Sequence, residues 1–393
     1  MPASSPPRAI ALYLAVVQFL FALGWTVYAT YLPELLQRAG VERAWTPWIL
    51  ALDQAVFALA DLAMGVAMDR ARASLRRVGP WLIGLVVLSS LAMIAMPRAS
   101  ALGGGPFLAL TVVWVASSAA LRVPPFALMG RYAAQSSVPW LAGLMLLGMA
   151  LAAALAPFLG LLLKQVDPAL PFALASVAIV ASSLGLVSAE RSLAANATGS
   201  TETGTPLPLA SRGALLLIGA LLLALLGYQV QVGLNAGEQI RRVADPALLP
   251  WLLPVFWAGF AFGLIPADHL GKRLGSARAF AAGCVGGALA LGFASSAGSV
   301  ALLAPLHGLA GAAWAVALAN AFGLATRSGR AGAEGRYTGI LFALFALGSL
   351  VRIALSLAGV PQALQGGTDW LAIAAWAGAA LLLLQMERGR RTA

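Results

Sequence analysis

The sequence predicts an all-α membrane protein with twelve transmembrane helices, arranged as two pseudo-symmetric bundles of six. Three observations support this prediction. The 393 residues are 61% hydrophobic and 10% charged, whereas soluble domains average about 45–50% apolar and about 25% charged residues. Twelve apolar segments approach the length of about 20 residues that a bilayer-spanning helix needs. Short features of the first six segments also recur in the last six.

The first six segments are each expected to form one helix. They lie near residues 10–36, 47–68, 80–97, 106–129, 139–163 and 169–187. Several begin at a proline, which suits a helix start because the missing N–H would have no partner there. The first segment follows a positive flank but stays apolar too long for a cleaved signal peptide, so we interpret it as a span.

Residues 188–212 are rich in Ala, Gly, Ser, Thr and Pro, and we interpret them as a flexible cytoplasmic linker. This linker separates an N-terminal bundle, residues 1–187, from a C-terminal bundle, residues 213–393. The second bundle has six further segments, near residues 213–235, 249–267, 277–295, 299–325, 338–359 and 370–386.

Two short matches relate the bundles to each other. Residues 47–50 (PWIL) match 250–253 (PWLL), and Gly24-Trp25 matches Gly227-Tyr228 at the same offset. Parallel six-span halves related by an axis along the membrane normal occur in a large class of secondary transporters.

The basic residues predict that both chain ends lie in the cytoplasm. With this topology most of the 25 Lys and Arg fall on the cytoplasmic side, where loops of membrane proteins collect them. The net charge of +11 is then a consequence of topology and implies no nucleic-acid partner. We expect a monomer in the lipid bilayer of a bacterial inner (plasma) membrane.

Several classes of function lack their motifs in this sequence. The single cysteine, Cys284, excludes an intramolecular disulfide and a cysteine metal cluster. There is no phosphate-binding Gly-x-x-x-x-Gly-Lys loop, no metal-ligand spacing and no nucleophile elbow. We therefore expect no enzyme activity, no cofactor and no bound metal.

Similar motifs of glycine and charged residues stand at the end of the second predicted span and after the eighth. The first consists of Gly65, Asp69, Arg70 and Arg72, and the second of Asp268, Gly271, Lys272 and Arg273. The two loops resemble the signature loops of the major facilitator superfamily, although Arg72, after Ala71, stands where its second glycine is expected. The resemblance implies the major facilitator fold. It also implies that the glycine lets the second span approach the eleventh, and that the Asp-Arg pair latches a cytoplasmic gate.

Within this superfamily, residues 61–81 are similar to the glycoside–pentoside–hexuronide:cation symporters. Those proteins carry a cation-site Asp pair four residues apart; Asp61 matches the second member, but Phe57 occupies the first position. Losing one ligand disfavours sodium, because hard cations need several oxygens. A proton needs a single carboxylate, so the sequence favours protons over sodium as the coupling ion.

Two acids lie inside the second span. A carboxylate in lipid costs a few kcal/mol or more and therefore faces protein or a water-filled cavity. We interpret Asp61, together with Asp53, as proton-coupling or substrate-gating carboxylates. The alternative is a structural pair with an arginine elsewhere in the chain.

Arg122 and Arg352 also lie within spans. Superfamily members often carry an arginine in the fourth span, linked to proton transfer or substrate contact, and Arg122 matches that position. The Pro124-Pro125 pair is expected to break the helix there. Counted by helical rise, Arg352 lies at the depth of Asp53, which predicts a charge pair between the halves when the periplasmic side closes. Alternatively, Arg352 binds an anionic substrate, or an arginine snorkels to an interface.

Other polar and aromatic residues within spans are candidates for lining a central cavity. They are Gln18, Tyr28, Tyr31, Gln54, Trp114, Gln229, Gln231, Asn235, His307, Trp314 and Asn320. Gln229 and Gln231 point about 200° apart on a helix, so only one can face the cavity. For His307 the alternative is a structural hydrogen bond, and for the tryptophans it is packing or an interfacial belt.

Taken together, these features predict a secondary active transporter that moves a small polar or anionic organic solute across the inner membrane by alternating access. Proton coupling through Asp61 and Asp53 is expected, with Arg122 tuning the site. A cation-coupled sugar symporter and a proton-driven efflux protein for amphipathic compounds are the alternatives. The fifth span lacks the Gly-Pro-x-x-Gly-Gly core of the superfamily's antiporters, which disfavours classical drug:proton exchange.

Overall fold

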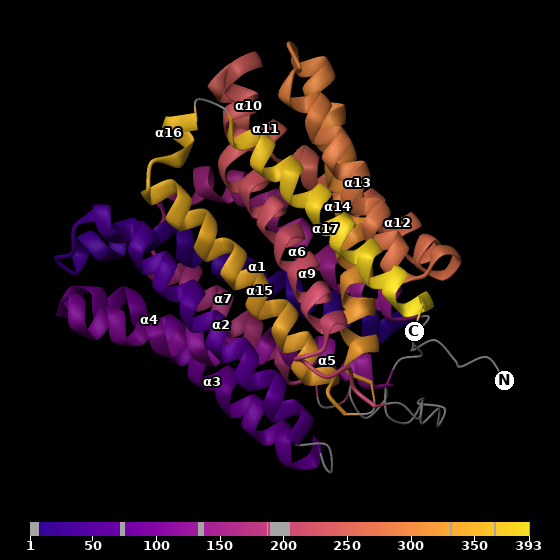
Figure 1. Cartoon of the computed structure of the whole chain (residues 1–393). Coiled ribbons are helices and arrows are strands. Elements are labelled where there is room, and N and C mark those ends of the chain that lie inside the picture. The colour runs from indigo at the N-terminus through magenta and orange to yellow at the C-terminus, as the bar shows by residue number, and fades with distance from the viewer. Residues whose placement is uncertain are drawn as a thin grey trace.

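The computed structural model describes residues 8–70, 75–132, 137–186, 188, 205–330, 332–364 and 367–392. Within these ranges all regular elements are helices, as the sequence predicts (Figure 1). The linker predicted at 188–212 lies largely outside the described residues, as does Arg72 of the predicted gate.

The described part of the first half contains seven α-helices because the fourth predicted span is divided. They are α1 (Arg8–Arg38), α2 (Thr46–Arg70), α3 (Leu75–Ala99), α4 (Gly104–Ser118), α5 (Val123–Tyr132), α6 (Val138–Leu162) and α7 (Ala169–Ser183). Short 3-10 turns adjoin them at Arg43–Trp45, Ser100–Leu102, Ala119–Leu121 and Leu163–Gln165.

The second half repeats the pattern of long helices with additional short ones at one end. It contains α9 (Arg212–Val230), α10 (Ala236–Val243), α11 (Leu249–Leu252), α12 (Pro254–Leu274), α13 (Ser276–Ser295), α14 (Val300–Ser328), α15 (Glu334–Leu357), α16 (Val360–Leu364) and α17 (Thr368–Thr392). A π-helical turn, Gln231–Asn235, joins α9 to α10, and a 3-10 turn lies at Pro246–Leu248.

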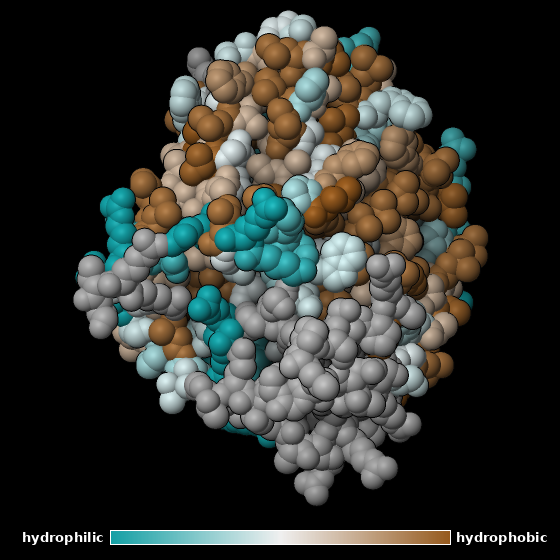
Figure 2. All heavy atoms as spheres, turned by 90° about the vertical axis from the view of Figure 1, so that its right-hand side faces the viewer, coloured by the Kyte–Doolittle hydropathy of each residue, from teal (hydrophilic) through white to brown (hydrophobic). Residues whose placement is uncertain are grey.

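Eleven helical stretches of the described chain are long and apolar enough to cross a membrane. The segment predicted as the sixth span is the apolar helix α7, which has only 15 residues. Apolar side chains cover the upper part of the face shown in Figure 2, and hydrophilic side chains cluster below them. Such an apolar surface is what a helix bundle in lipid presents.

Two helix pairs form the most extensive contacts between the halves. Helix α2 lies against α15, and α6 lies against α12; Figure 1 shows α15 running beside α2. We call the end of the bundle where α2 finishes the Asp69 end. Helix α5 lies at this end, and α10, α11 and α16 lie at the opposite end (Figure 1).

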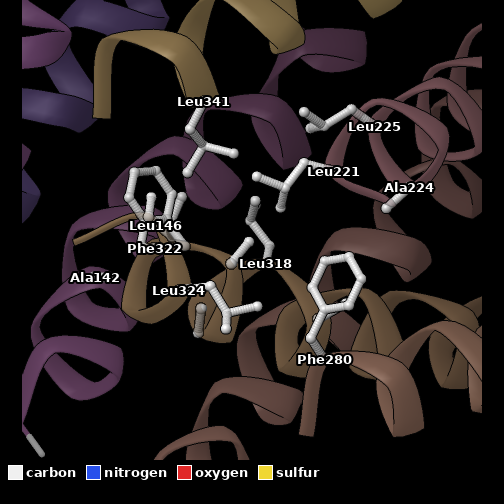
Figure 3. Packing of buried hydrophobic residues seen from close by; sticks show 14 of the residues in the cluster. Ala142, Leu146, Leu221, Ala224, Leu225, Phe280, Leu318, Phe322, Leu324 and Leu341 are labelled. Atoms are coloured by element: carbon white, nitrogen blue, oxygen red, sulfur yellow. The ribbon is translucent and has the colours of Figure 1, made fainter. Parts of the chain in front are cut away.

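The largest cluster of buried apolar side chains draws on both halves. Figure 3 shows part of it, where Ala142 and Leu146 of α6 lie near Leu318, Phe322 and Leu324 of α14. Because lipid is as apolar as these side chains, such contacts hold helices together by close packing more than by the hydrophobic effect.

The fourth span is broken at Arg122, as predicted from the adjacent proline pair. Helix α4 ends at Ser118, a 3-10 turn follows, and α5 starts at Val123. Proline removes a backbone donor and clashes with the preceding turn. The break places the Arg122 backbone between two helices.

Two helix ends differ from the sequence prediction. The seventh span continues past residue 235 through the π-helical turn into α10, and the eighth continues to Leu274. The residues 268–273, predicted as a loop, are therefore the last turns of α12, which ends where Gly275 adopts a φ of 79°. Polar residues can continue a helix beyond the bilayer, so hydropathy alone placed these ends too early.

Candidate functional site

A cavity of about 350 Å³ lies between the two halves. Helices α1 and α2 line it from the first half, and α9 and α15 line it from the second. Its described lining contains two arginines, Arg122 and Arg352, and no aspartate or glutamate. Of the predicted polar candidates, Gln18, Gln54 and Gln229 also line it.

Arg122, which lines the cavity, forms an ion pair with Asp61, which does not. The Arg122 Nη2 lies 3.2 Å from the Asp61 Oδ2, and the Asp61 side chain is fully buried. The guanidinium carbon also lies 4.3 Å from the ring centre of Phe57 and 5.4 Å from that of Phe342. Phe57 thus contributes a cation–π contact at the position where the symporter resemblance would place a second acid.

Arg352 lines the cavity from the other half without a carboxylate partner. Among the described residues it makes no ion pair or hydrogen bond, and its buried Nε has no partner. Gly233, in the π-helical turn, leaves room for it, because a Cβ there would overlap the Arg352 side chain. With Asp61 already facing Arg122, the cavity carries one guanidinium charge that no described carboxylate balances.

The predicted pair between Asp53 and Arg352 is not formed in this structure. Asp53 Oδ2 instead accepts a hydrogen bond of 2.7 Å from the Tyr28 hydroxyl, within the first half. The second oxygen, Oδ1, is buried without a partner among the described residues. The pair was predicted for the state closed on the periplasmic side. Here Asp53 faces Tyr28 of α1, whereas Arg352 lines the cavity.

Several of the predicted lining residues lie outside the cavity wall. Tyr28 is buried against Trp114, with ring centres 4.5 Å apart. The Tyr31 hydroxyl donates to the backbone carbonyls of Leu163 and Val166. These three side chains connect helices of the first half to one another.

A buried polar network follows the π-helical turn of the second half. Gln231 Nε2 donates to Gln239 Oε1 at 3.0 Å, and His307 Nε2 lies 2.7 Å from the same oxygen. Asn235 donates to Gln231 and to a backbone carbonyl of α17. Gln231, Asn235 and His307 therefore link α10, α14 and α17 and do not line the cavity, which Gln229 does.

A second, aromatic chamber of about 210 Å³ adjoins the cavity. Its ring-bearing lining residues are Trp25, Tyr228, Trp257, Phe260, Trp314 and Phe345. The cavity and the chamber share Ala22, Trp25, Met149, Tyr228 and Phe345. We call this space the aromatic chamber; of the predicted candidates, Trp314 lies in it.

Asp69 joins the halves at its end of the bundle. Its two carboxylate oxygens accept hydrogen bonds from the backbone N–H groups of Gly335, at 2.8 Å, and Arg336, at 2.9 Å. These donors belong to the first turn of α15, where helix N–H groups lack intrahelical partners and the helix dipole favours a negative charge. Asp69 therefore caps a helix of the opposite half, whereas Arg70 is exposed.

Gly65 permits the close approach that this cap requires. A Cβ on Gly65 would overlap the carbonyl oxygen of Gly335 and lie 3.0 Å from the Cα of Gly339. Sequence reasoning anticipated Gly65 but missed Gly335 and Gly339, although their small-x-x-x-small spacing is a known signal for close helix packing. It also missed Arg131, whose Nη2 donates to the Met68 carbonyl near the end of α2.

The second gate motif makes different contacts. Asp268 pairs with Lys272, one turn along the same helix, and its Oδ1 is buried without a partner among the described residues. Gly271 packs against Asn320 and Pro139, and Asn320 donates to the Ala267 carbonyl. Arg273 is exposed. In the described part of the chain, this motif packs helices together but provides no cap equivalent to that of Asp69.

Aromatic side chains add to the closure at the Asp69 end. Phe126 of α5 stacks on Phe322 of α14 with ring centres 4.4 Å apart, and meets the edge of Phe342 at 5.1 Å. Nearby, Gly130 lies against Thr326. Phe342 also lines the cavity, so these contacts join the halves beside it.

Asp69→Ala is expected to destabilise the protein, because it leaves two backbone donors of α15 without their acceptor. Hydrogen bonds to charged groups contribute about 1.5–3 kcal/mol. Thermal unfolding in detergent measures the effect. Asp268→Ala is the matched control because, among the described residues, its carboxylate pairs with a half-exposed lysine on its own helix. Equal losses of stability in the two variants would contradict the capping role.

Solved transporter structures share this fold. A bacterial homologue of the iron transporter ferroportin, in its outward-facing state, aligns with a TM-score of 0.76 at 14% identity, over 96% of this chain and 99% of that one. The human organic anion transporter MFSD10 (TETRAN) aligns with a TM-score of 0.71 at 15% identity, over 97% and 100%. The E. coli fucose:proton symporter FucP aligns with a TM-score of 0.66 at 13% identity, over 98% and 99%.

FucP belongs to the major facilitator superfamily, so the fold of this chain is that of major facilitator transporters. The predicted sub-family of glycoside–pentoside–hexuronide:cation symporters is not among these similar structures. No family model matches the sequence, and no curated protein matches it.

Proposed function

We propose that this chain is a proton-coupled secondary transporter that carries a small organic anion across a bacterial inner membrane by alternating access. The observation that carries the proposal is Arg352, a guanidinium that lines the cavity between the halves without a described partner. A buried charge without a partner is costly. An anion that enters the cavity supplies that partner, and a guanidinium fork suits carboxylate or phosphate groups.

The pairing of Asp61 with Arg122 supports proton coupling. When Asp61 is ionised, it forms an ion pair with Arg122, with 3.2 Å between the Arg122 Nη2 and the Asp61 Oδ2. Protonation removes the negative charge of Asp61, and Arg122 then becomes available to a substrate anion in the cavity. Loss of the proton restores the ion pair and competes with the substrate. Proton and anion therefore favour each other's binding, which is the relation that symport requires.

Closure at the Asp69 end supports alternating access. On the predicted topology this end is cytoplasmic, which makes the conformation outward-facing. The ferroportin homologue and one FucP structure are outward-facing as well. In this scheme, transport requires the Asp69 cap and the Gly65 contact to separate, so that the cavity reaches the cytoplasm.

Arg352→Gln is expected to weaken carboxylate binding by about 10–100-fold, because it removes charge-assisted hydrogen bonds of about 1.5–3 kcal/mol. A thermal-stability screen of carboxylates, sugars and amphipathic cations, at two pH values, measures binding. Arg327→Gln is the control, because Arg327 is exposed on α14. In the absence of ligand, Arg352→Gln should be at least as stable as the wild type, since it removes an unpaired charge.

Two other outcomes of the screen would replace this proposal. Stabilisation by sugars alone, unaffected by Arg352→Gln, would favour a cation-coupled sugar symporter. Stabilisation by amphipathic cations alone would favour proton-driven efflux. Carboxylate binding that persists in Arg352→Gln would remove the assigned role of this arginine.

A further inference from the structure

The aromatic chamber is built from both halves at positions that the sequence repeats. Trp25 of α1 and Tyr228 of α9 occupy equivalent places in the Gly24-Trp25 and Gly227-Tyr228 matches. Both residues line the border between the cavity and the aromatic chamber. The internal repeat therefore places one aromatic ring from each half at the entrance to the chamber.

Each of these two rings is fixed by further aromatic contacts. Tyr228 stacks on Trp314 with ring centres 4.9 Å apart and planes within 8°. Trp314 stacks in turn on Trp376, whose Nε1 donates to the Ala224 carbonyl at 2.8 Å. Gly227 is required here, because a Cβ at this position would lie 2.5 Å from the Trp376 ring. This wall of the chamber is anchored before any ligand arrives.

Trp25 is anchored in the same way within the first half. It stacks on Trp114 at 5.9 Å and lies 5.4 Å from both Tyr28 and Phe57. Trp114 and Tyr28, predicted as cavity residues, thus pack against Trp25 but line neither the cavity nor the aromatic chamber. Rings held in this way keep their positions when a ligand binds, which lowers the entropic cost of binding.

The chamber and the cavity differ in chemistry. The described lining of the aromatic chamber contains no charged residue and no amide, and its one hydroxyl outside the tyrosine, on Thr26, already donates to the Ala22 carbonyl. Its volume of about 210 Å³ exceeds the roughly 150 Å³ of an apolar cavity that accepts benzene. The adjoining cavity supplies the two guanidinium groups.

We propose that the transported anion carries an aromatic or similarly flat apolar body, which lies in the aromatic chamber while its acidic group faces Arg352 and Arg122. This inference rests on the proposed anion transport and adds the substrate class. One molecule reaches both places because the two spaces share five lining residues. Bound between Trp25 and Tyr228, the ring would contact both halves.

The test compares three probes that separate the ring from the charge. They are 3-phenylpropionate, butyrate, which has the acid without the ring, and 3-phenylpropanol, which has the ring without the charge. Titrated thermal shifts of the purified full-length chain measure their affinities. We expect 3-phenylpropionate to bind at least tenfold more tightly than either of the others, because ring burial and charge pairing both contribute.

Filling the chamber then tests where the ring lies. Ala153 of α6 lines the aromatic chamber, and Ala154, the next residue, lines neither space. Ala153→Phe is expected to remove the tenfold preference for 3-phenylpropionate over butyrate and to leave butyrate binding unchanged. Ala154→Phe is expected to keep the preference. Retained butyrate binding also shows that the filled variant is folded.

The outcomes separate this inference from the function on which it rests. Equal binding of 3-phenylpropionate and butyrate, both lost in Arg352→Gln, would overturn the aromatic substrate class and leave anion transport standing. Equal loss of preference in Ala153→Phe and Ala154→Phe would also overturn the placement of the ring. Binding of 3-phenylpropanol as tight as that of 3-phenylpropionate would overturn the proposed anion function instead.

Discussion

Asp61→Asn is expected to abolish proton-driven accumulation of substrate while leaving exchange of substrate for substrate intact. The amide cannot take up a proton, so a pH gradient no longer changes the occupancy of Arg122. Exchange needs only the conformational change with substrate bound, which keeps both arginines. Uptake of 3-phenylpropionate into proteoliposomes, with and without a pH gradient, and counterflow without one, measure the two processes after subtraction of protein-free liposomes.

The same substitution is expected to destabilise the fold. Removing one partner of a buried ion pair costs about 3–5 kcal/mol, since the other charge is left buried. Arg122 is the remaining charge, with a side chain only 12% exposed. The double variant Asp61→Asn/Arg122→Gln removes both charges and should recover much of the lost stability, which a double-mutant cycle measures. Gradient-driven accumulation by Asp61→Asn at the wild-type rate would refute the coupling role.

Gly65→Ala is expected to prevent closure at the Asp69 end and to abolish transport. The added methyl group meets the backbone of Gly335 and Gly339, which cannot rotate away as a side chain would. Overpacking of this kind costs about 1–3 kcal/mol, and each 1.4 kcal/mol changes a population tenfold. The conformation closed at this end would thus lose much of its population.

The readout for Gly65→Ala is accessibility from the Asp69 end. Thr326 is 1% exposed at this end, so a cysteine introduced by Thr326→Cys should react slowly in the wild-type background and rapidly beside Gly65→Ala. The matched control is Gly84→Ala on α3, where a Cβ meets no atom within 4 Å. Unchanged reactivity and unchanged transport in Gly65→Ala would show that α2 and α15 accommodate the added methyl group, which would contradict this prediction.

The two gate motifs were identified from their residues, but the contacts that these residues make differ between the two halves. The first motif correctly directed attention to Gly65 and to the approach of the second and eleventh spans. The second motif resembles the family pattern in its residues, yet in the described chain Asp268 bonds along its own helix and Gly271 packs against Asn320. A motif specifies which groups are present, and the neighbouring helices decide what those groups contact.

The sequence by itself determined the helical fold, the approximate limits of the spans and the break at Arg122. These features depend on local properties: the length of apolar runs, the missing donor of proline and the distribution of charge along the chain. The same local signals identified the four charged residues within spans, because a charge in an apolar run is conspicuous in any sequence.

Only the tertiary structure decided how these charges are paired. Asp61 pairs with Arg122, and Asp53 accepts a hydrogen bond from Tyr28. Arg352 lines the cavity without a carboxylate partner among the described residues. Helical rise predicts depth, but the partner of a side chain depends on how each helix is rotated and on which helix packs beside it. Those are properties of contacts between residues far apart in sequence, so the chamber formed by Trp25 and Tyr228 became visible only when the two halves were brought together.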